Sequence, residues 1–189
     1  MNSFDAVRRT LVALESLSVK YVLVGALATN VYSIPRSTKD ADIVVVFEAG
    51  ELRRLRNALG SDFEFNPQMM LEVLTGSIRN EIRFLPTGFL IDLFRLSDDD
   101  HHQLLMERRV CARIAEIDLE VWIPTVEDLI VQKVRWGRRK DQDDVVNMLS
   151  FNHEQLDWKY IFGWTELHGT TPLLRQLCTE VPGLRLPPE

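Results

Sequence analysis

The feature that most constrains the fold is a run of branched aliphatic residues preceded by two aspartates. Residues Ile43–Phe47 form a β-branched run typical of a central, buried strand, and Asp40-Ala41-Asp42 leads directly into it. Because side chains two apart on a strand point to the same face, Asp40 and Asp42 would point one way and Ala41 the other. Two carboxylates that close repel each other unless a cation lies between them. The pattern therefore predicts a buried strand that begins with an acidic pair.

A second apolar segment carries one carboxylate in its middle. Residues 89–94 read Phe-Leu-Ile-Asp-Leu-Phe, with Asp92 as the exception. Burying an unpaired carboxylate costs several kcal/mol, so such a residue needs a partner nearby. If this strand lies beside the Ile43–Phe47 strand, Asp92 reaches the same end of the sheet as Asp40 and Asp42. Three oxygen ligands that meet there suit Mg²⁺ or Mn²⁺.

Both acidic features can also be explained without a metal ion. Asp40 and Asp42 can be ordinary turn residues that precede a strand. Asp92 can be exposed at a strand end, or paired with one of three arginines: Arg79, Arg83 or Arg95. The sequence leaves these alternatives open beside the metal site.

A glycine turn precedes the acidic strand. Tyr21–Val24 reads as a short buried strand that Gly25 ends, residues 26–31 begin a helix, and Pro35 stops it. The N-terminus of a helix offers free N–H groups and the positive end of a dipole, which suits a phosphate. Gly25 would let the backbone approach that phosphate closely. A lone glycine at such a turn is also often only a steric requirement.

The remaining candidates are basic residues that could bind phosphate and the aspartates that could pair with them. Arg36 can pair with a phosphate and Thr38 can donate a hydroxyl, or both can be exposed loop groups. Lys133 lies in the middle of the apolar face of a helix, where a lysine extends to solvent or finds an anion. It can form a structural ion pair with Asp141 or Asp144 of the next helix. It can equally contact a triphosphate, with both aspartates orienting it.

The rest of the chain predicts an α+β fold: a mixed β-sheet flanked by helices, with a helical C-terminal third. Residues 1–124 would form the core, and residues 125–189 would complete the same domain. Further strands are expected at residues 77–85, 89–96, 110–114 and 119–123. Helices are expected at residues 4–14 (capped by Asn2 or Ser3), 51–59, 67–74, 125–135, 141–149, 154–167 and 172–180, before an extended tail from 182 to 189.

Composition narrows the possible partners and location. With 189 residues, the chain can bury a sizeable core without disulfides, and two distant cysteines suit a reducing cytosol. Neither a signal peptide nor a membrane-spanning stretch is expected, so we expect a cytoplasmic protein. The net charge of −6 disfavours long nucleic acids. A nucleoside triphosphate or an RNA end stays possible because basic residues cluster locally: Arg135, Arg138, Arg139 and Lys140.

The order of these motifs resembles the DNA-polymerase-beta-like nucleotidyltransferase superfamily. The chain has a glycine turn after a strand, Arg36-Ser37-Thr38, an Asp-x-Asp at a strand start, and a distant strand aspartate. The C-terminal part is similar to AbiEii-type, toxin-related nucleotidyltransferases. That similarity rests on residues 127–130, Lys133, residues 138–141 and Asp144. The resemblance covers roughly residues 21 to 149.

The resemblance implies a two-metal nucleotidyl transfer. Asp40, Asp42 and Asp92 would be the catalytic metal ligands for Mg²⁺ or Mn²⁺. The triphosphate, ATP among the candidates, would be bound by seven residues: Gly25, Ala26, Arg36, Thr38, Lys133, Asp141 and Asp144. The acceptor would be a protein hydroxyl, a tRNA 3′ end or a small molecule.

One departure from the superfamily pattern keeps a second function open. The turn usually reads Gly-Ser or Gly-Gly, whereas this chain has Gly25-Ala26 and so lacks the serine hydroxyl. The alternative is a weak or inactive nucleotide-binding module, with a toxin or antitoxin as its partner. A third reading is a plain α/β domain whose acidic residues are structural.

Overall fold

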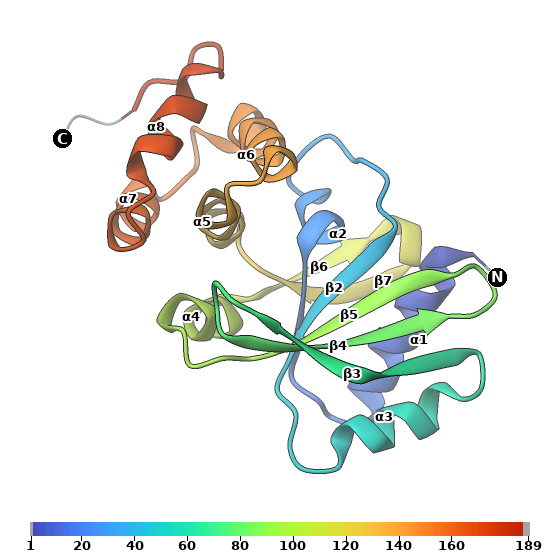
Figure 1. Ribbon diagram of the computed structural model, residues 1–189. Helices are drawn as coiled ribbons and strands as arrows, with labels where there is room; N and C mark the ends of the chain where they lie inside the picture. Colours follow the sequence, from blue (N-terminus) through green and yellow to red (C-terminus); the bar gives the residue numbers. More distant parts are fainter. Residues whose placement is uncertain (1, 187–189) are drawn as a thin grey trace.

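The computed structural model describes residues 2–186 and contains a twisted five-stranded sheet (Figure 1). The spatial order of its strands is β1-β2-β5-β4-β3. Their bounds are β1 (Tyr21–Val24), β2 (Asp40–Val45), β3 (Phe63–Glu72), β4 (Ser77–Phe84) and β5 (Phe89–Arg95). A separate hairpin, β6 (Val110–Ile114) and β7 (Leu119–Ile123), is joined by a short 3₁₀ turn, Ala115–Ile117.

The pairing of β2 with β5 determines where the acidic residues meet. These two strands run parallel, whereas β1–β2, β4–β5 and β3–β4 are antiparallel. In the parallel register Asp42 lies directly opposite Asp92. Parallel strands start at the same edge of a sheet, so the sequence-distant aspartates come together there.

Helices cover the sheet and extend from it. Figure 1 shows α1 behind the strands, α3 beside it, and the four C-terminal helices grouped at one side of the sheet. The bounds are α1 (Ser3–Ser16), α2 (Gly25–Thr29), α3 (Glu51–Leu59), α4 (Asp100–Arg108), α5 (Val126–Trp136), α6 (Arg139–Asn152), α7 (Trp158–Leu167) and α8 (Thr171–Thr179). Within residues 2–186, no helix combines the length and apolar character needed to cross a membrane.

Most of the predicted elements are confirmed, together with the α+β class. The first helix begins with a capping box in which Asn2 and Asp5 satisfy each other's backbone N–H groups. Thr125 caps α5 by accepting from the backbone N–H of Asp128. The predicted extended tail lies partly outside the described residues, and Pro182–Leu186 contains neither helix nor strand.

The helix predicted at residues 67–74 is wrong. These residues belong to β3, the edge strand, which pairs antiparallel with β4. Pro67 favoured a helix start, but here it lies in the interval between Phe65 and Met69 where the register shifts. A proline is tolerated at such an irregularity on an edge strand, since no ladder hydrogen bond from its nitrogen is needed. The β3–β4 hairpin therefore extends as far as the pairing of Glu72 with Ser77.

A buried carboxylate, Asp128, anchors α5 to its neighbours. Its side chain is fully buried and accepts hydrogen bonds from Thr125, Arg108 and Tyr160, with His101 Nε2 3.4 Å away. Burial alone would raise the pKa of Asp128, but the nearby His101 and the hydrogen bonds from Tyr160 and Thr125 outweigh it and lower the pKa. The cluster connects α4, α5 and α7, and it therefore fixes the helix that carries Lys133.

Candidate functional site

Three acidic residues line one cavity at the edge where β2 and β5 begin. The cavity has a volume of about 600 Å³, and its floor includes Asp40, Asp42 and Asp92. The β3–β4 hairpin forms one wall, and the region between α5 and α6 forms another. The other lining residues are Met70, Leu71, Glu72, Leu74, Arg79, Phe94, Trp136, Arg138 and Lys140. The arrangement predicted from β2 and the 89–96 strand is therefore present in the structure.

Among the three aspartates of this edge, Asp42 has the pKa that its surroundings raise most clearly. Its pKa is raised from 3.8 to about 6, chiefly by burial and then by the nearby charges of Asp40 and Asp92. Lys140 and Lys133 oppose this rise without cancelling it. Negative charge at this edge is therefore incompletely compensated, which is the condition that favours a bound cation.

Asp92 is buried and only half satisfied. Its Oδ2 accepts a hydrogen bond from Nη1 of Arg79 at 2.8 Å, whereas its buried Oδ1 has no hydrogen-bond partner among the described residues. Burial raises the pKa of Asp92, Arg79 opposes this, and Glu81 and Asp40 add to it. The structural alternative of a pairing with Arg79 is therefore present. It accounts for one carboxylate oxygen and leaves the other available.

Gly25 makes room for Asp42. It has a φ of +65°, and a Cβ placed on it would lie 2.1 Å from Oδ2 of Asp42. Any side chain here would collide with that carboxylate, and the positive φ would also strain an L-residue. The sequence suggested either the approach of a phosphate or a purely steric role for Gly25; the observed neighbour is Asp42. Ala26, which follows, is buried.

Gly25→Ala should destabilise the protein by about 2 kcal/mol or more, since a methyl group there adds a steric clash to backbone strain. Gly76→Ala is the matched control, because Gly76 has a φ of +67° with open space around its Cβ position. Urea denaturation of both variants separates the clash from the strain. Equal losses of unfolding free energy would show that contact with Asp42 does not require glycine at position 25.

The basic residues of the candidate site form an ion-pair network. Arg36 holds Asp144 with two hydrogen bonds of 2.7 and 2.8 Å. Nζ of Lys133 lies 2.7 Å from Oδ2 of Asp144 and 3.5 Å from Oδ1 of Asp141. The structural ion pair proposed for Lys133 is therefore present, and Arg36 is not a free loop group. Burial raises the pKa of Asp144, but Arg36 and Lys133 lower it overall.

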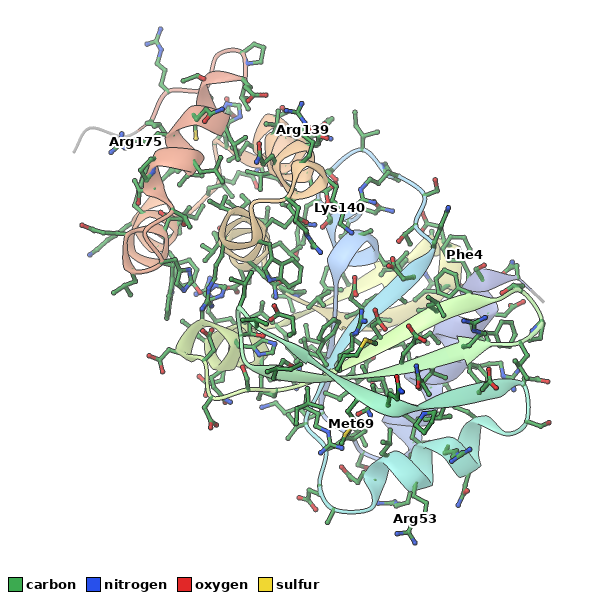
Figure 2. The ribbon with its side chains drawn as sticks, in the orientation of Figure 1. Phe4, Arg53, Met69, Arg139, Lys140 and Arg175 are labelled. Carbon is green, nitrogen blue, oxygen red and sulfur yellow. The ribbon has the colours of Figure 1, made fainter. Side chains whose placement is uncertain are left out.

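A second, smaller cavity of about 30 Å³ joins the glycine turn to this network. Among its lining residues are Gly25, Ala26, Arg36, Thr38 and Lys133. Asp40, Asp42, Trp136 and Lys140 line both cavities, so the two are neighbours. Thr38 donates to Oδ1 of Asp40 at 2.6 Å. Lys140 lies where α6 comes near α2 (Figure 2).

Sequence reasoning missed the residues contributed by the β3–β4 hairpin. Met70 and Glu72 were assigned to a helix, so no cavity wall was expected from them. Arg79 was considered only as one of three possible partners of Asp92. Trp136 carried no signal apart from its place beside the basic cluster. The alternation of apolar and polar residues along 63–66 was the signal for the start of this strand.

The residues at the acidic edge fit a hard divalent cation by donor type and charge. They are carboxylate oxygens, one of which is buried without a partner. However, no three His, Cys, Asp or Glu side chains in the described part of the chain are already placed as ligands around one point. Arg79 contributes to this, because it holds the second oxygen of Asp92. A cation would therefore require these side chains to adjust.

Sequence comparisons find no match, whereas structural comparisons find proteins of similar fold. No family model and no curated protein matches the chain. The antibiotic-resistance factor ANT(2'')-Ia is 14% identical over 92% of this chain and 94% of its own, with a TM-score of 0.58. An antigenic nucleotidyltransferase-like protein from Paracoccidioides brasiliensis is 19% identical over 93% and 91%, with a TM-score of 0.53.

A third solved structure, of the lincosamide antibiotic adenylyltransferase LnuA bound to lincomycin, also has a similar fold. It is 13% identical over 79% of this chain and 96% of its own, with a TM-score of 0.52. Identities this low establish the architecture only. The chain therefore has the mixed-sheet fold of the nucleotidyltransferase structures that it resembles.

Proposed function

We propose that the protein is a metal-dependent nucleotidyltransferase, which transfers a nucleoside monophosphate from a nucleoside triphosphate to a hydroxyl acceptor. The observation that carries this proposal is the meeting of Asp40, Asp42 and Asp92 on one cavity that adjoins a cluster of cationic side chains. Acidic ligands beside basic phosphate-binding groups are what a triphosphate with a divalent cation requires.

The acidic residues have distinct roles in this proposal. Asp40 and Asp42 would hold Mg²⁺ or Mn²⁺, with Asp92 as the third ligand. The cation would supply charge neutralisation at the α-phosphate and the pyrophosphate. The acceptor oxygen forms a bond to the α-phosphorus, the bond from that phosphorus to the bridging oxygen breaks, and pyrophosphate leaves. Asp92 would take up the hydroxyl proton of the acceptor, since carboxylates within reach can act as general bases.

The triphosphate would lie along the basic side of the cavity. Lys140 is exposed and lines both cavities, so it is available to phosphate oxygens. Arg138 also lines both cavities, but it is paired with Asp141. Lys133 and Arg36 are already paired with Asp144. Their role would be to hold the loop before β2 against α5 and α6, and to keep positive charge beneath the phosphates. Asp141 and Asp144 orient them.

The acceptor we favour is a small molecule or a protein hydroxyl. The cavity of about 600 Å³ has apolar walls made by Met70, Leu71, Leu74, Phe94 and Trp136, and the chain has a net charge of −6. A cavity of this size accommodates a drug-sized ligand. LnuA is an adenylyltransferase bound to lincomycin, and ANT(2'')-Ia has been solved with adenylyl-2''-tobramycin. These neighbours make ATP the first nucleotide to test.

The alternative is a nucleotide-binding module with little turnover, as in a toxin–antitoxin pair of the AbiEii type. Two observations favour it: Ala26 provides no hydroxyl at the turn, and Arg79 holds one oxygen of Asp92. This alternative predicts nucleotide binding without transfer.

The test is incubation of the pure protein with each α-labelled triphosphate and a cell lysate, with and without Mg²⁺. Label should appear on an acceptor only with Mg²⁺, and Asp92→Asn should abolish it. Asp118→Asn, at an exposed turn, is the control that should label normally. If every triphosphate binds and none labels an acceptor, the binding module is the correct function. If none binds, the proposal is wrong.

A further inference from the structure

Among residues 2–186, Arg79 is the one basic residue whose side chain forms an ion pair with Asp40, Asp42 or Asp92. It comes from β4, which pairs with β5, and its Nη1 lies 2.8 Å from Oδ2 of Asp92. Its Nη2 lies 3.0 Å from the thioether sulfur of Met70. The Arg79 side chain is 30% exposed, whereas that of Asp92 is 8% exposed. The guanidinium therefore reaches from a solvent-accessible cavity wall to a buried carboxylate.

We propose that Arg79 is the resident counter-ion of Asp92, and that a divalent cation must displace it to gain Asp92 as a ligand. This inference rests on the proposed function, since it concerns the same acidic site. It makes Arg79 a positioning residue, which acts through Asp92.

The contact is suited to exchange because it is a weak form of an arginine–carboxylate pair. Arg79 gives Asp92 one hydrogen bond, and its second terminal nitrogen rests on a sulfur, which is a weak acceptor. The Arg36–Asp144 pair in the same protein is bidentate, and Lys133 also contacts Asp144. Bidentate pairs are the stronger class. Of the two carboxylates, Asp92 is therefore the one that can change partner.

The acidic groups around Asp92 also offer a divalent cation oxygen atoms that Arg79 does not contact. Oδ1 of Asp92 is buried without a hydrogen-bond partner among the described residues. Asp40 and Asp42 line the same cavity, and the carboxylate hydrogen bond of Arg79 goes to Asp92 and not to either of them. A divalent ion would satisfy Oδ1 and the acidic pair together, which Arg79 cannot do from its place on β4. Once released, Arg79 still lines the cavity that would receive the anionic triphosphate.

Manganese affinity without nucleotide provides the test, measured by the electron paramagnetic resonance signal of free Mn²⁺. Arg79→Met keeps an apolar stem and removes the competing charge, so it should bind Mn²⁺ about tenfold more tightly, or about 1.4 kcal/mol. Arg83→Met is the matched control, because Arg83 lies four residues along the same strand and is exposed. Its affinity should stay within about twofold of the unmodified protein, as expected for a surface charge.

A double-mutant cycle shows whether Arg79 lowers Mn²⁺ affinity by occupying Asp92 or only through its positive charge. In an Asp92→Asn background, Arg79→Met should change Mn²⁺ affinity by no more than about twofold, since its partner is gone. An equal gain in both backgrounds would overturn the proposal. Arg79→Gln serves the same cycle if the methionine variant does not fold.

The two proposals fail differently. If the unmodified protein and Arg79→Met bind Mn²⁺ equally well, or the variant binds less tightly, the counter-ion inference is wrong and the metal site stands. If neither binds Mn²⁺ at any concentration while both remain folded, the metal site itself is wrong, and the inference is wrong with it.

Discussion

Replacing Asp42 by asparagine should reduce nucleotidyl transfer by roughly 10³-fold or more, while making the metal-free protein more stable. Activity falls because the asparagine amide cannot supply the charge that holds a divalent cation against a triphosphate, and losing one such electrostatic group costs about this much. Stability rises because Asp42 is buried beside two other carboxylates. Opposite changes in activity and stability distinguish a functional carboxylate from a structural one.

The gain in stability depends on pH in a defined direction. The pKa of Asp42 is raised from 3.8 to about 6 in the folded protein, so the folded state takes up a proton more readily than the unfolded chain. Ionised Asp42 therefore disfavours folding increasingly as pH rises from about 4 to above 6. The full shift corresponds to roughly 3 kcal/mol, and partial exposure of the carboxylate reduces it to about 1–2 kcal/mol.

Urea denaturation in EDTA at pH 4 and pH 7.5 measures this effect. Asp42→Asn should raise the free energy of unfolding at pH 7.5 and leave it nearly unchanged at pH 4. Asp118→Asn, at an exposed position, should change neither activity nor stability appreciably. A loss of stability at pH 7.5 for Asp42→Asn would contradict this account, because it would mean that the ionised carboxylate stabilises the metal-free fold.

Lys133→Met should cause the largest loss of stability, about 3 kcal/mol, and should also impair activity. Lys133 is only 3% exposed and lies between Asp144 and Asp141. Methionine keeps the stem and removes the ammonium, which leaves two buried carboxylates with one cationic partner fewer. The loss stays near the lower end of the range for a broken buried pair, because Arg36 and Arg138 still contact these aspartates.

Two comparisons test the reason for this loss. Lys159→Met removes an exposed lysine from α7 and should change the free energy of unfolding by less than about 0.5 kcal/mol. The double variant Lys133→Met, Asp144→Asn should lose less stability than the sum of the two single variants, because either substitution alone already removes the Lys133–Asp144 pair. A loss below about 1 kcal/mol for Lys133→Met, with strictly additive losses in the double variant, would contradict the network's role in holding α5 to α6.

Much of the fold and the acidic part of the site could be predicted because the signals are local. Ile43–Phe47 and Phe89–Phe94 are strong strand patterns, and strand periodicity places Asp40 and Asp42 on one face. The convergence of Asp92 with this pair needed one assumption, that the two strands are neighbours. The parallel β2–β5 register satisfies it.

The hairpin wall could not be predicted because long-range pairing overrides local preference there. Pro67 favours a helix start by its own conformation, yet residues 69–72 pair with β4. Without that strand, Met70 could not be placed at the cavity. Three arginines were possible partners of Asp92. The β4–β5 register places Glu81 opposite Asp92, with Arg79 and Arg83 two residues to either side, and the side-chain contact itself selects Arg79.

The ion pairs of the loop before β2 were invisible to sequence reasoning for a similar reason. Arg36 and Asp144 are 108 residues apart, and their contact depends on how α6 packs against the sheet. Asp128 was missed because an acidic residue in the first turn of a helix is ordinary. Its complete burial depends on α4 and α7, which bring His101, Arg108 and Tyr160 to it.

The central claim is that Asp40, Asp42 and Asp92 together bind a divalent cation, and crystals soaked in Mn²⁺ test it most directly. Anomalous diffraction should place one strong manganese peak at this edge of the sheet, with an oxygen from each aspartate about 2.0–2.3 Å away. Arg79 should have left Asp92 in the same crystal. Saturating Mn²⁺ that gives no peak there, with Asp92 still bound to Arg79, would contradict the claim.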